Sequence, residues 1–386
     1  MKFLLFFISS VYFFQVFSQK NEFEGVSFDD DVHRMNEYGF ELYDELNVQE
    51  TNFVISSFSL SVVFSMLENG AEGTTSDEIN NVAHLQNDRE ERNDSYKAMF
   101  NYLKQDTLQN GVFNWAVRVF LDDQIKRTDD AYSEVLEEYY YSELIDFDFA
   151  IERTVNNKIQ SWMNESLYKE MQFSSQEKKR YKDINLDLAA VTYLDGEWLN
   201  SFDGVRLGKF LSPSGDSVSC KYLHAQDYPV KVKVNPDFVG DTIFEIPFRG
   251  NLCFQFLKEA DSSEVSRGFS YQDYQGFIAI DSSVLYDIQL PQLNMDKIVK
   301  LEETLNDLGM RAPFSGNADF TSISKGLQLR EVWHESFLSF DSSGKQGRLL
   351  RFEDSPKLIV NKPFRFFVRG QRSDILLFMG VYTGIQ

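Results

Sequence analysis

Apolar residues recur at helical spacing along much of the first half of the chain. Residues 27–46 alternate apolar and charged positions as an amphipathic helix does, and residues 59–69 repeat the pattern. Ser57 or Ser59 is the candidate N-cap of this second helix, and Gly70 follows its end. Further helices are predicted to begin at Ser76 and to cover residues 95–105, 132–140, 154–169 (with Trp162 on the apolar side) and 299–308.

The second half of the chain is dominated by β patterns. Residues 188–194 form a nearly continuous apolar run, which is typical of a central strand buried on both faces. Because helices come first and strands later, without a linker or repeat, the pattern predicts one α+β domain over residues 19–386. The other predicted strands are 52–55, 112–120, 231–234, 242–248, 252–257, 286–290, 365–368 and 375–380.

The first residues follow a different pattern. Lys2 precedes an apolar stretch that ends at Phe17, which is shorter than the ~20 residues of a membrane-spanning helix. Val16 and Ser18 occupy the two positions that a signal peptidase reads. The pattern predicts a signal peptide over residues 1–18 and a secreted, extracellular mature chain; a transmembrane anchor is the alternative. No later stretch is apolar enough to span a bilayer, so we expect no membrane partner.

The charge of the chain excludes some partners. Sixty acidic residues against 38 basic ones give a formal net charge of −22. Nucleic acids and anionic membrane surfaces repel such a protein, so we expect neither as a partner. The largest basic cluster, residues 177–180, is typical of a solvated surface.

The predicted export decides which modifications are open to two cysteines and two sequons. An oxidising compartment allows a disulfide between Cys220 and Cys253. Free thiols are the alternative, because Cys253 lies in a buried-strand pattern. Asn93-Asp94-Ser95 and Asn164-Glu165-Ser166 predict glycosylation at Asn93 and Asn164.

Catalytic motifs are absent from the sequence. The four histidines (33, 84, 224 and 334) belong to no zinc-protease motif, and there is no nucleophile elbow, phosphate loop or dinucleotide fingerprint. Two isolated cysteines do not make a zinc site. We therefore expect no enzyme, no metal and no cofactor.

Five segments agree with one known family in residues and in order. They are NFVISSFSL (52–60), LDGEW (194–198), LGM with ADF (308–310 and 318–320), VWHESF (332–337), and NKPFRFFV with LFMG (361–368 and 377–380). Together they span most of residues 30–381, and the chain resembles the serpins, the serine protease inhibitor family. The resemblance implies an α+β fold with helices packed around three β-sheets and an exposed reactive-centre loop, here about residues 342–360.

The resemblance also implies a mechanism. An inhibitory serpin offers the loop to a serine protease, and after cleavage the loop enters the main sheet as a new strand. Ser56, His334 and Trp198 match the family where this sheet opens. Ala190 stands where the family usually has an asparagine.

The loop departs from the inhibitory pattern. Gly344 matches the glycine that begins the hinge, but Ser342 and Ser343 replace an acidic pair. The stretch from Gly344 to Pro363 is several residues shorter than in typical inhibitors. Where inhibitors carry alanine and threonine, residues 345–351 read Lys-Gln-Gly-Arg-Leu-Leu-Arg, so that the hinge consists of Gly344, Lys345, Gln346 and Gly347.

An inserted strand turns alternate side chains to opposite faces of the sheet. One register places Lys345 and Arg351 on one face, and the other face then carries Arg348. A buried, unpaired cation costs several kcal/mol. We therefore expect insertion to stall at Lys345.

Three functions remain open for the chain. The first is a non-inhibitory serpin, which binds an extracellular protein or is cleaved without trapping. The second is an inhibitor of a trypsin-like serine protease with Arg351-Phe352 or Arg348-Leu349 as the reactive bond, since such enzymes cut after a basic residue. The third is a carrier of a small ligand. We expect a monomer that resembles divergent insect serpin-like proteins of secreted fluids, including seminal proteins.

Overall fold

The structure is a computed structural model of the chain. It describes residues 22–23, 25–46, 51–107, 113–128, 130–149, 157–158, 161–162, 165, 185–238, 240–259, 268–279, 283–330, 332–344 and 355–385. No helix in these ranges is both long and apolar enough to cross a bilayer.

The amino-terminal helices surround a buried central helix. Helix α1 (Asp29–Leu46) begins with three aspartates, whose charge favours a helix N-terminus. Helix α2 (Ser57–Glu68) is buried along its whole length, and Ser56 caps it because its Oγ accepts the backbone N–H of Ser59. The predicted cap at Ser57 or Ser59 is therefore wrong by one or more residues. The other helices are α3 (Gly73–Val82), α4 (Arg89–Thr107), α5 (Ala131–Tyr140), α7 (Tyr271–Gln275), α8 (Glu302–Leu308) and the 3-10 helix η2 (Ala312–Phe314).

A five-stranded sheet has the order β13-β14-β6-β4-β5. Strands β14 and β6 run parallel and pair directly, from Glu335 opposite Val191 to Ser339 opposite Asp195. The predicted central strand at residues 188–194 is confirmed as part of β6. The bounds are β13 (Asn294–Lys300), β14 (Trp333–Ser339), β6 (Leu186–Asp195), β4 (Phe113–Asp122) and β5 (Leu144–Phe147).

A second sheet has ten described strands and turns around the long strand β8 (Ser217–Val234), which pairs with four neighbours. Its path is β15-β12-β8-β9-β10-β16-β17-β3, and β7 and β11 also pair with β8. The bounds are β15 (Lys357–Ile359), β12 (Val284–Pro291), β9 (Thr242–Pro247), β10 (Leu252–Lys258), β16 (Phe364–Gly370), β17 (Leu376–Tyr382), β3 (Phe53–Ile55), β7 (Gly204–Leu211) and β11 (Ile278–Ala279); β1 (Glu22–Phe23) and β2 (Val26–Ser27) form a separate pair.

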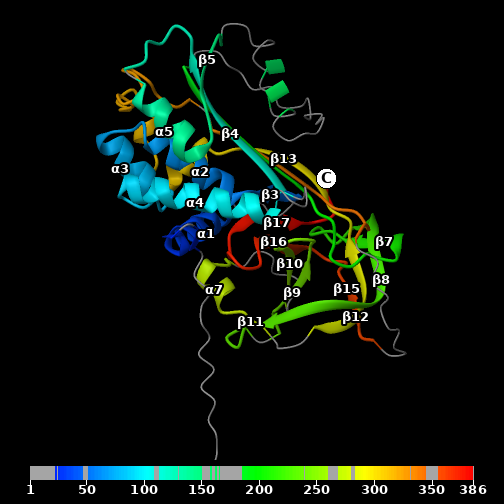
Figure 1. Cartoon of the computed structure of the whole chain (residues 1–386). Helices are drawn as coiled ribbons and strands as arrows, with labels where there is room; N and C mark the ends of the chain where they lie inside the picture. Colours follow the sequence, from blue (N-terminus) through cyan, green and yellow to red (C-terminus); the bar gives the residue numbers. More distant parts are fainter. Residues whose placement is uncertain are drawn as a thin grey trace, which may run out of the picture.

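Helices and sheets occupy different parts of the molecule. Helices α1 to α5 gather on one side of the long strands β4 and β13, and β7, β8, β12 and β15 lie at the opposite end (Figure 1). Helix α2 packs against β6 and β17, so it joins the two large sheets. This arrangement confirms the predicted α+β class with helices packed around three sheets.

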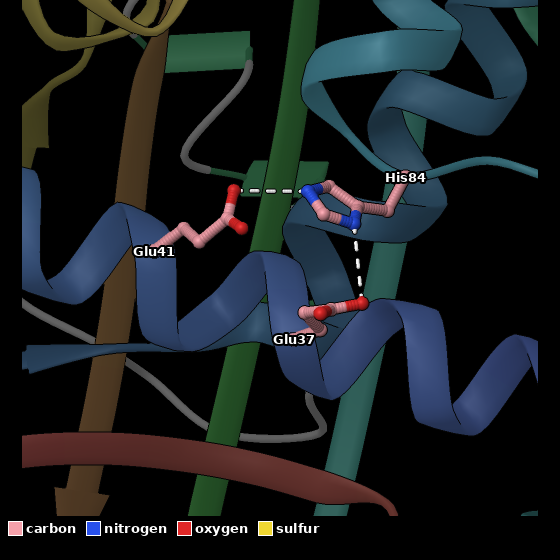
Figure 2. Close-up of side chains that lie close together, drawn as sticks. All are labelled: Glu37, Glu41 and His84. Atoms are coloured by element: carbon pink, nitrogen blue, oxygen red, sulfur yellow. Dashed lines mark hydrogen bonds and ion pairs between the residues drawn. The ribbon is translucent and has the colours of Figure 1, made fainter. Parts of the chain in front are cut away.

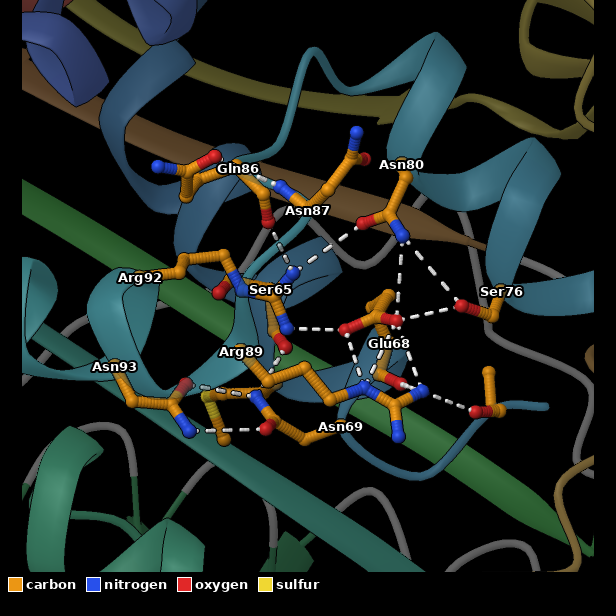
Figure 3. A network of polar contacts seen from close by, with 12 residues as sticks. Ser65, Glu68, Asn69, Ser76, Asn80, Gln86, Asn87, Arg89, Arg92 and Asn93 are labelled. Carbon is orange, nitrogen blue, oxygen red and sulfur yellow. Dashed lines mark hydrogen bonds and ion pairs between the residues drawn. The ribbon is translucent and has the colours of Figure 1, made fainter.

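A buried polar network fixes the end of α2 (Figure 3). The Glu68 carboxylate accepts hydrogen bonds from Arg92 Nη2 and Arg89 Nε, and the Ser76 hydroxyl donates to it at 2.6 Å. Glu68 and Arg92 are both fully buried. These contacts tie helices α2, α3 and α4 together.

Candidate functional site

His334 lies inside the five-stranded sheet, on the face that packs against α2. Its Nε2 accepts the backbone N–H of Ser56 at 2.8 Å, and Ser336 Oγ lies 2.7 Å from the same nitrogen. A nitrogen that accepts a hydrogen bond carries no proton, so the ring proton of the neutral imidazole sits on Nδ1. Ser56 and His334, which the family resemblance grouped together, are in contact between β14 and the N-cap of α2.

Trp198 lies beyond the carboxyl end of β6 in an aromatic cluster. Its ring stacks on Phe248 with centroids 4.5 Å apart and meets Phe340 edge-on at 4.9 Å. Its indole N–H donates to the Asp341 carbonyl at 2.7 Å. Trp198 therefore holds the chain that leaves β14. The sequence did not indicate the Asp341 carbonyl, because a backbone acceptor has no residue signature.

The base of the loop continues the pairing of β14 with β6. The backbone N–H of Trp198 donates to Ser343 O and that of Phe202 to Ser342 O, both at 3.1 Å. Trp198 and Gly344 form a parallel bridge. A Cβ at Gly344 would come within 2.7 Å of the Ser201 nitrogen, so this close approach requires glycine. Gly344 is thus explained by packing as well as by the hinge pattern.

Both faces of the junction between β14 and β6 are buried. The inner face, toward α2, consists of His334, Ser336 and Leu338 on β14 with Ala190, Thr192 and Leu194 on β6, all nearly inaccessible to solvent. None of these six side chains is a carboxylate.

The outer face carries Glu335 and Phe337, each 6% exposed, opposite Val191 and Tyr193. A strand inserted between β14 and β6 would therefore bury its side chains on either face.

One carboxyl pair lies beside the outer face. Desolvation between β13 and β14, together with the negative charge of Glu335, raises the pKa of Asp296 to about 6. The sequence did not indicate this pair, because the pairing of β13 with β14 creates it.

Several predicted residues lie outside the described ranges. These are the proposed signal peptide (residues 1–18), the glycosylation candidate Asn164, the hinge residues Lys345, Gln346 and Gly347, and the bond candidates Arg348, Leu349, Arg351 and Phe352.

The structure bears on the two cysteines, for which a disulfide and free thiols were both left open, and on the sequon at Asn93. Cys220 and Cys253 are both buried free thiols, so the candidate disulfide is absent. Burial raises the pKa of the Cys253 thiol to about 12, which keeps it protonated and unreactive. Asn93 is only 5% exposed, and its Nδ2, the atom that a glycan would modify, donates to Asn69 at 3.0 Å. Glycosylation at Asn93 is incompatible with this packing.

A separate cavity of about 650 Å³ lies between β4, α5 and the end of α4. Its aromatic lining includes Trp115, Tyr141 and Trp162. Lys104 Nζ sits 3.6 Å from the centre of the Tyr141 ring, and burial lowers the pKa of Lys104. Among the residues that the structure describes, no carboxylate forms an ion pair with Lys104. A cavity of this size accommodates a drug-sized molecule.

The family model described as serpin (serine protease inhibitor) matches residues 33–384. A serpin-like protein of Methanosarcina acetivorans is 24% identical over 378 residues, which cover 89% of this chain and 85% of the relative. Intracellular coagulation inhibitor 2 of Tachypleus tridentatus is 23% identical over 374 residues, which cover 90% of this chain and 89% of the relative. The crystal structure of native protease nexin-1 with heparin superimposes with a TM-score of 0.80 at 18% identity, over 92% of this chain and 99% of that one.

Proposed function

The chain belongs to the serpin family, and we propose that it is a non-inhibitory member whose reactive loop does not enter the five-stranded sheet. It would act outside the cell as a binding protein or as a protease substrate. Serpins are protease inhibitors rather than catalysts, so a serine protease is the natural first partner to test. The observation that carries the proposal is the burial of both faces between β14 and β6.

An inserted strand can adopt two registers, and in both of them the loop turns at least one cation toward the buried inner face. If Lys345 and Arg351 face inward, two cations meet the inner face; otherwise Arg348 does. The six inner-face side chains offer only an imidazole, hydroxyls and hydrocarbon. Glu335 provides a carboxylate on the outer face alone. In either register at least one cation is buried without an ionic partner.

The energetic balance then opposes insertion. An inserted strand would replace the one ladder of backbone hydrogen bonds between β14 and β6 by two, and each added bond favours insertion by about 0.5–1.5 kcal/mol. A buried, unpaired lysine or arginine costs several kcal/mol. We infer that the cost of the buried cations outweighs the gain in backbone hydrogen bonds.

We expect trypsin to cut the loop without being trapped. The purified chain is incubated with trypsin at near-equal amounts and analysed on a denaturing gel. Cleavage after Arg348 or Arg351 with no band at the summed mass is the expected result. A stable band at the summed mass would mean that the chain inhibits trypsin-like proteases by insertion, and the proposal would be wrong.

The cavity beside Lys104 favours carriage of a small ligand as a second candidate function. The aromatic walls and the cations Lys104 and Arg118 favour a planar aromatic anion, which must bind away from Glu137 and Glu143 on the same lining. We expect the chain to bind 1-anilinonaphthalene-8-sulfonate and the Lys104→Met variant to bind it at least ~10-fold more weakly, because a charge-assisted contact of ~1.5 kcal/mol is lost.

Lys97→Met is the matched control, because Lys97 lies on the same helix and over the ring of Tyr139 at 5.2 Å but outside the cavity. Equal binding by the wild-type chain and both variants, measured by dye fluorescence, would contradict a ligand role for this cavity.

A further inference from the structure

Glu37, Glu41 and His84 form a cluster on the surface that plays no part in the loop site (Figure 2). The two glutamates are one turn apart on α1 and point toward the imidazole, which follows the end of α3. His84 Nε2 lies 2.9 Å from Glu41 Oε2, and Nδ1 lies 3.4 Å from Glu37 Oε2. The side chains are 24%, 44% and 49% exposed for His84, Glu37 and Glu41, so an ion can reach them from solvent.

We propose that these three side chains bind a divalent transition-metal ion of the Zn²⁺ class. Imidazole nitrogen and carboxylate oxygen are the donors that Zn²⁺ accepts besides thiolate. The histidine distinguishes the cluster from an ordinary acidic surface, because carboxylates alone favour Mg²⁺ or Ca²⁺. Solvent would fill the remaining coordination position.

The spacing of the donors is close to that of a metal site. One donor atom from each residue lies within 4.8 Å of the other two. Zn²⁺ sits about 2.0–2.2 Å from nitrogen and oxygen ligands, so tetrahedral ligands are about 3.4 Å apart. The 2.9 Å between His84 Nε2 and Glu41 Oε2 therefore needs a slight opening. Glu37 faces the other ring nitrogen and must swing toward Nε2, which a half-exposed side chain can do at little cost.

The charges of the cluster also fit a divalent ion. Within the described part of the chain, no lysine or arginine forms an ion pair with Glu37 or Glu41. A protonated His84 supplies one positive charge to two carboxylates, whereas a divalent ion with neutral imidazole balances both. The net charge of −22 raises the local concentration of cations further.

Metal binding would connect two elements that pack around α2. Glu37 and Glu41 belong to α1, and His84 directly follows the C-cap of α3. An ion that binds only the folded chain stabilises it by mass action.

The test is calorimetric titration of the full, tag-free chain with Zn²⁺ at neutral pH. We expect one saturable site, and at least ~10-fold weaker binding by each of Glu37→Gln, Glu41→Gln and His84→Gln, because loss of even an outer-shell partner costs about 10–100-fold in metal affinity. Glu45→Gln is the matched control, since it removes the same charge from α1 one turn beyond Glu41. It should keep the wild-type affinity.

The folding of each variant is checked by far-ultraviolet circular dichroism, and Co²⁺ provides a second readout. Tetrahedral Co²⁺ with the wild-type chain should give visible absorption bands that His84→Gln lacks. No saturable Zn²⁺ binding by the wild-type chain overturns the proposal. Binding that survives His84→Gln, or that Glu45→Gln weakens as much as Glu41→Gln does, also overturns it.

Discussion

At the scale of single residues, Glu245 on β9 lies among three cationic side chains. Arg369 Nη2 lies 3.1 Å from its carboxylate, Lys231 Nζ lies 3.2 Å away, and Gln255 donates to it at 2.7 Å. Burial alone would raise the pKa of Glu245, but the charges of Arg369 and Lys233 outweigh it and lower the pKa to about 2.

This lowered pKa predicts a pH dependence of stability. A carboxyl group whose folded pKa is below its unfolded value stabilises the fold above the unfolded pKa, near 4.5. The contribution, about 3 kcal/mol, is lost as the pH falls from about 4.5 toward 2. Urea unfolding between pH 7 and pH 3 should show a falling free energy of unfolding.

Glu245→Gln should be less stable at pH 7 and show a flatter profile below pH 4.5. Glu197→Gln is the control, because Glu197 pairs with Arg249 on the exposed surface. Such a pair contributes about 0–1 kcal/mol, so this variant should keep the wild-type profile. If both variants keep it, Glu245 does not carry the stability assigned to it.

For two single residues, the helix N-cap at Ser56 and the sequon at Asn93, the sequence did not predict the observed contacts. The pattern around residue 57 predicted a helix start correctly, but the choice among Ser56, Ser57 and Ser59 depends on backbone geometry. The sequon at Asn93 has the required residues, yet Asn69 and Tyr140 bury its side chain. These contacts are long-range, so local sequence does not contain them.

At the scale of elements, the loop allows a test of its side chains. We predict that the double variant Lys345→Thr, Arg348→Thr inserts more readily after cleavage, because neither register then buries a cation before residue 351. The variant should gain thermal stability on cleavage, or trap trypsin in a denaturing-gel assay.

Lys357→Thr is the matched control, since Lys357 lies exposed on β15 and its pairing is with β12. It should behave as the wild-type chain does. Identical behaviour of the double variant and the wild-type chain would mean that loop length, rather than charge, prevents insertion.

Element boundaries follow tertiary pairing more than local pattern. Residues 299–308 were predicted as one helix, but Val299 belongs to β13 and pairs with His334, and α8 begins only at Glu302. Helix α4 begins at Arg89, six residues before its predicted start. Its first turn is charged, which hid the start of the helix. Arg92 is buried there because it forms an ion pair with Glu68. The strands β7 and β13 have weak alternation and were not predicted.

For the whole molecule, five short segments predicted the fold correctly because they are spread along the chain in the family order. The resemblance also grouped Ser56, His334 and Trp198, and the structure places Ser56 in contact with His334. It did not predict that both faces of the β14–β6 junction are buried, because this depends on the packing of separate elements. Because both faces are buried, insertion of the charged loop would bury at least one cation.

The most direct measurement is the melting temperature of the chain before and after a single cut in the loop, verified by mass. We predict that the two values agree within a few degrees, because the cut loop stays outside the sheet. A rise of more than about 10 °C would correspond to several kcal/mol of added stability. Such a rise would show that residues 345–351 enter the sheet despite their charges, and it would contradict the proposed non-inhibitory function.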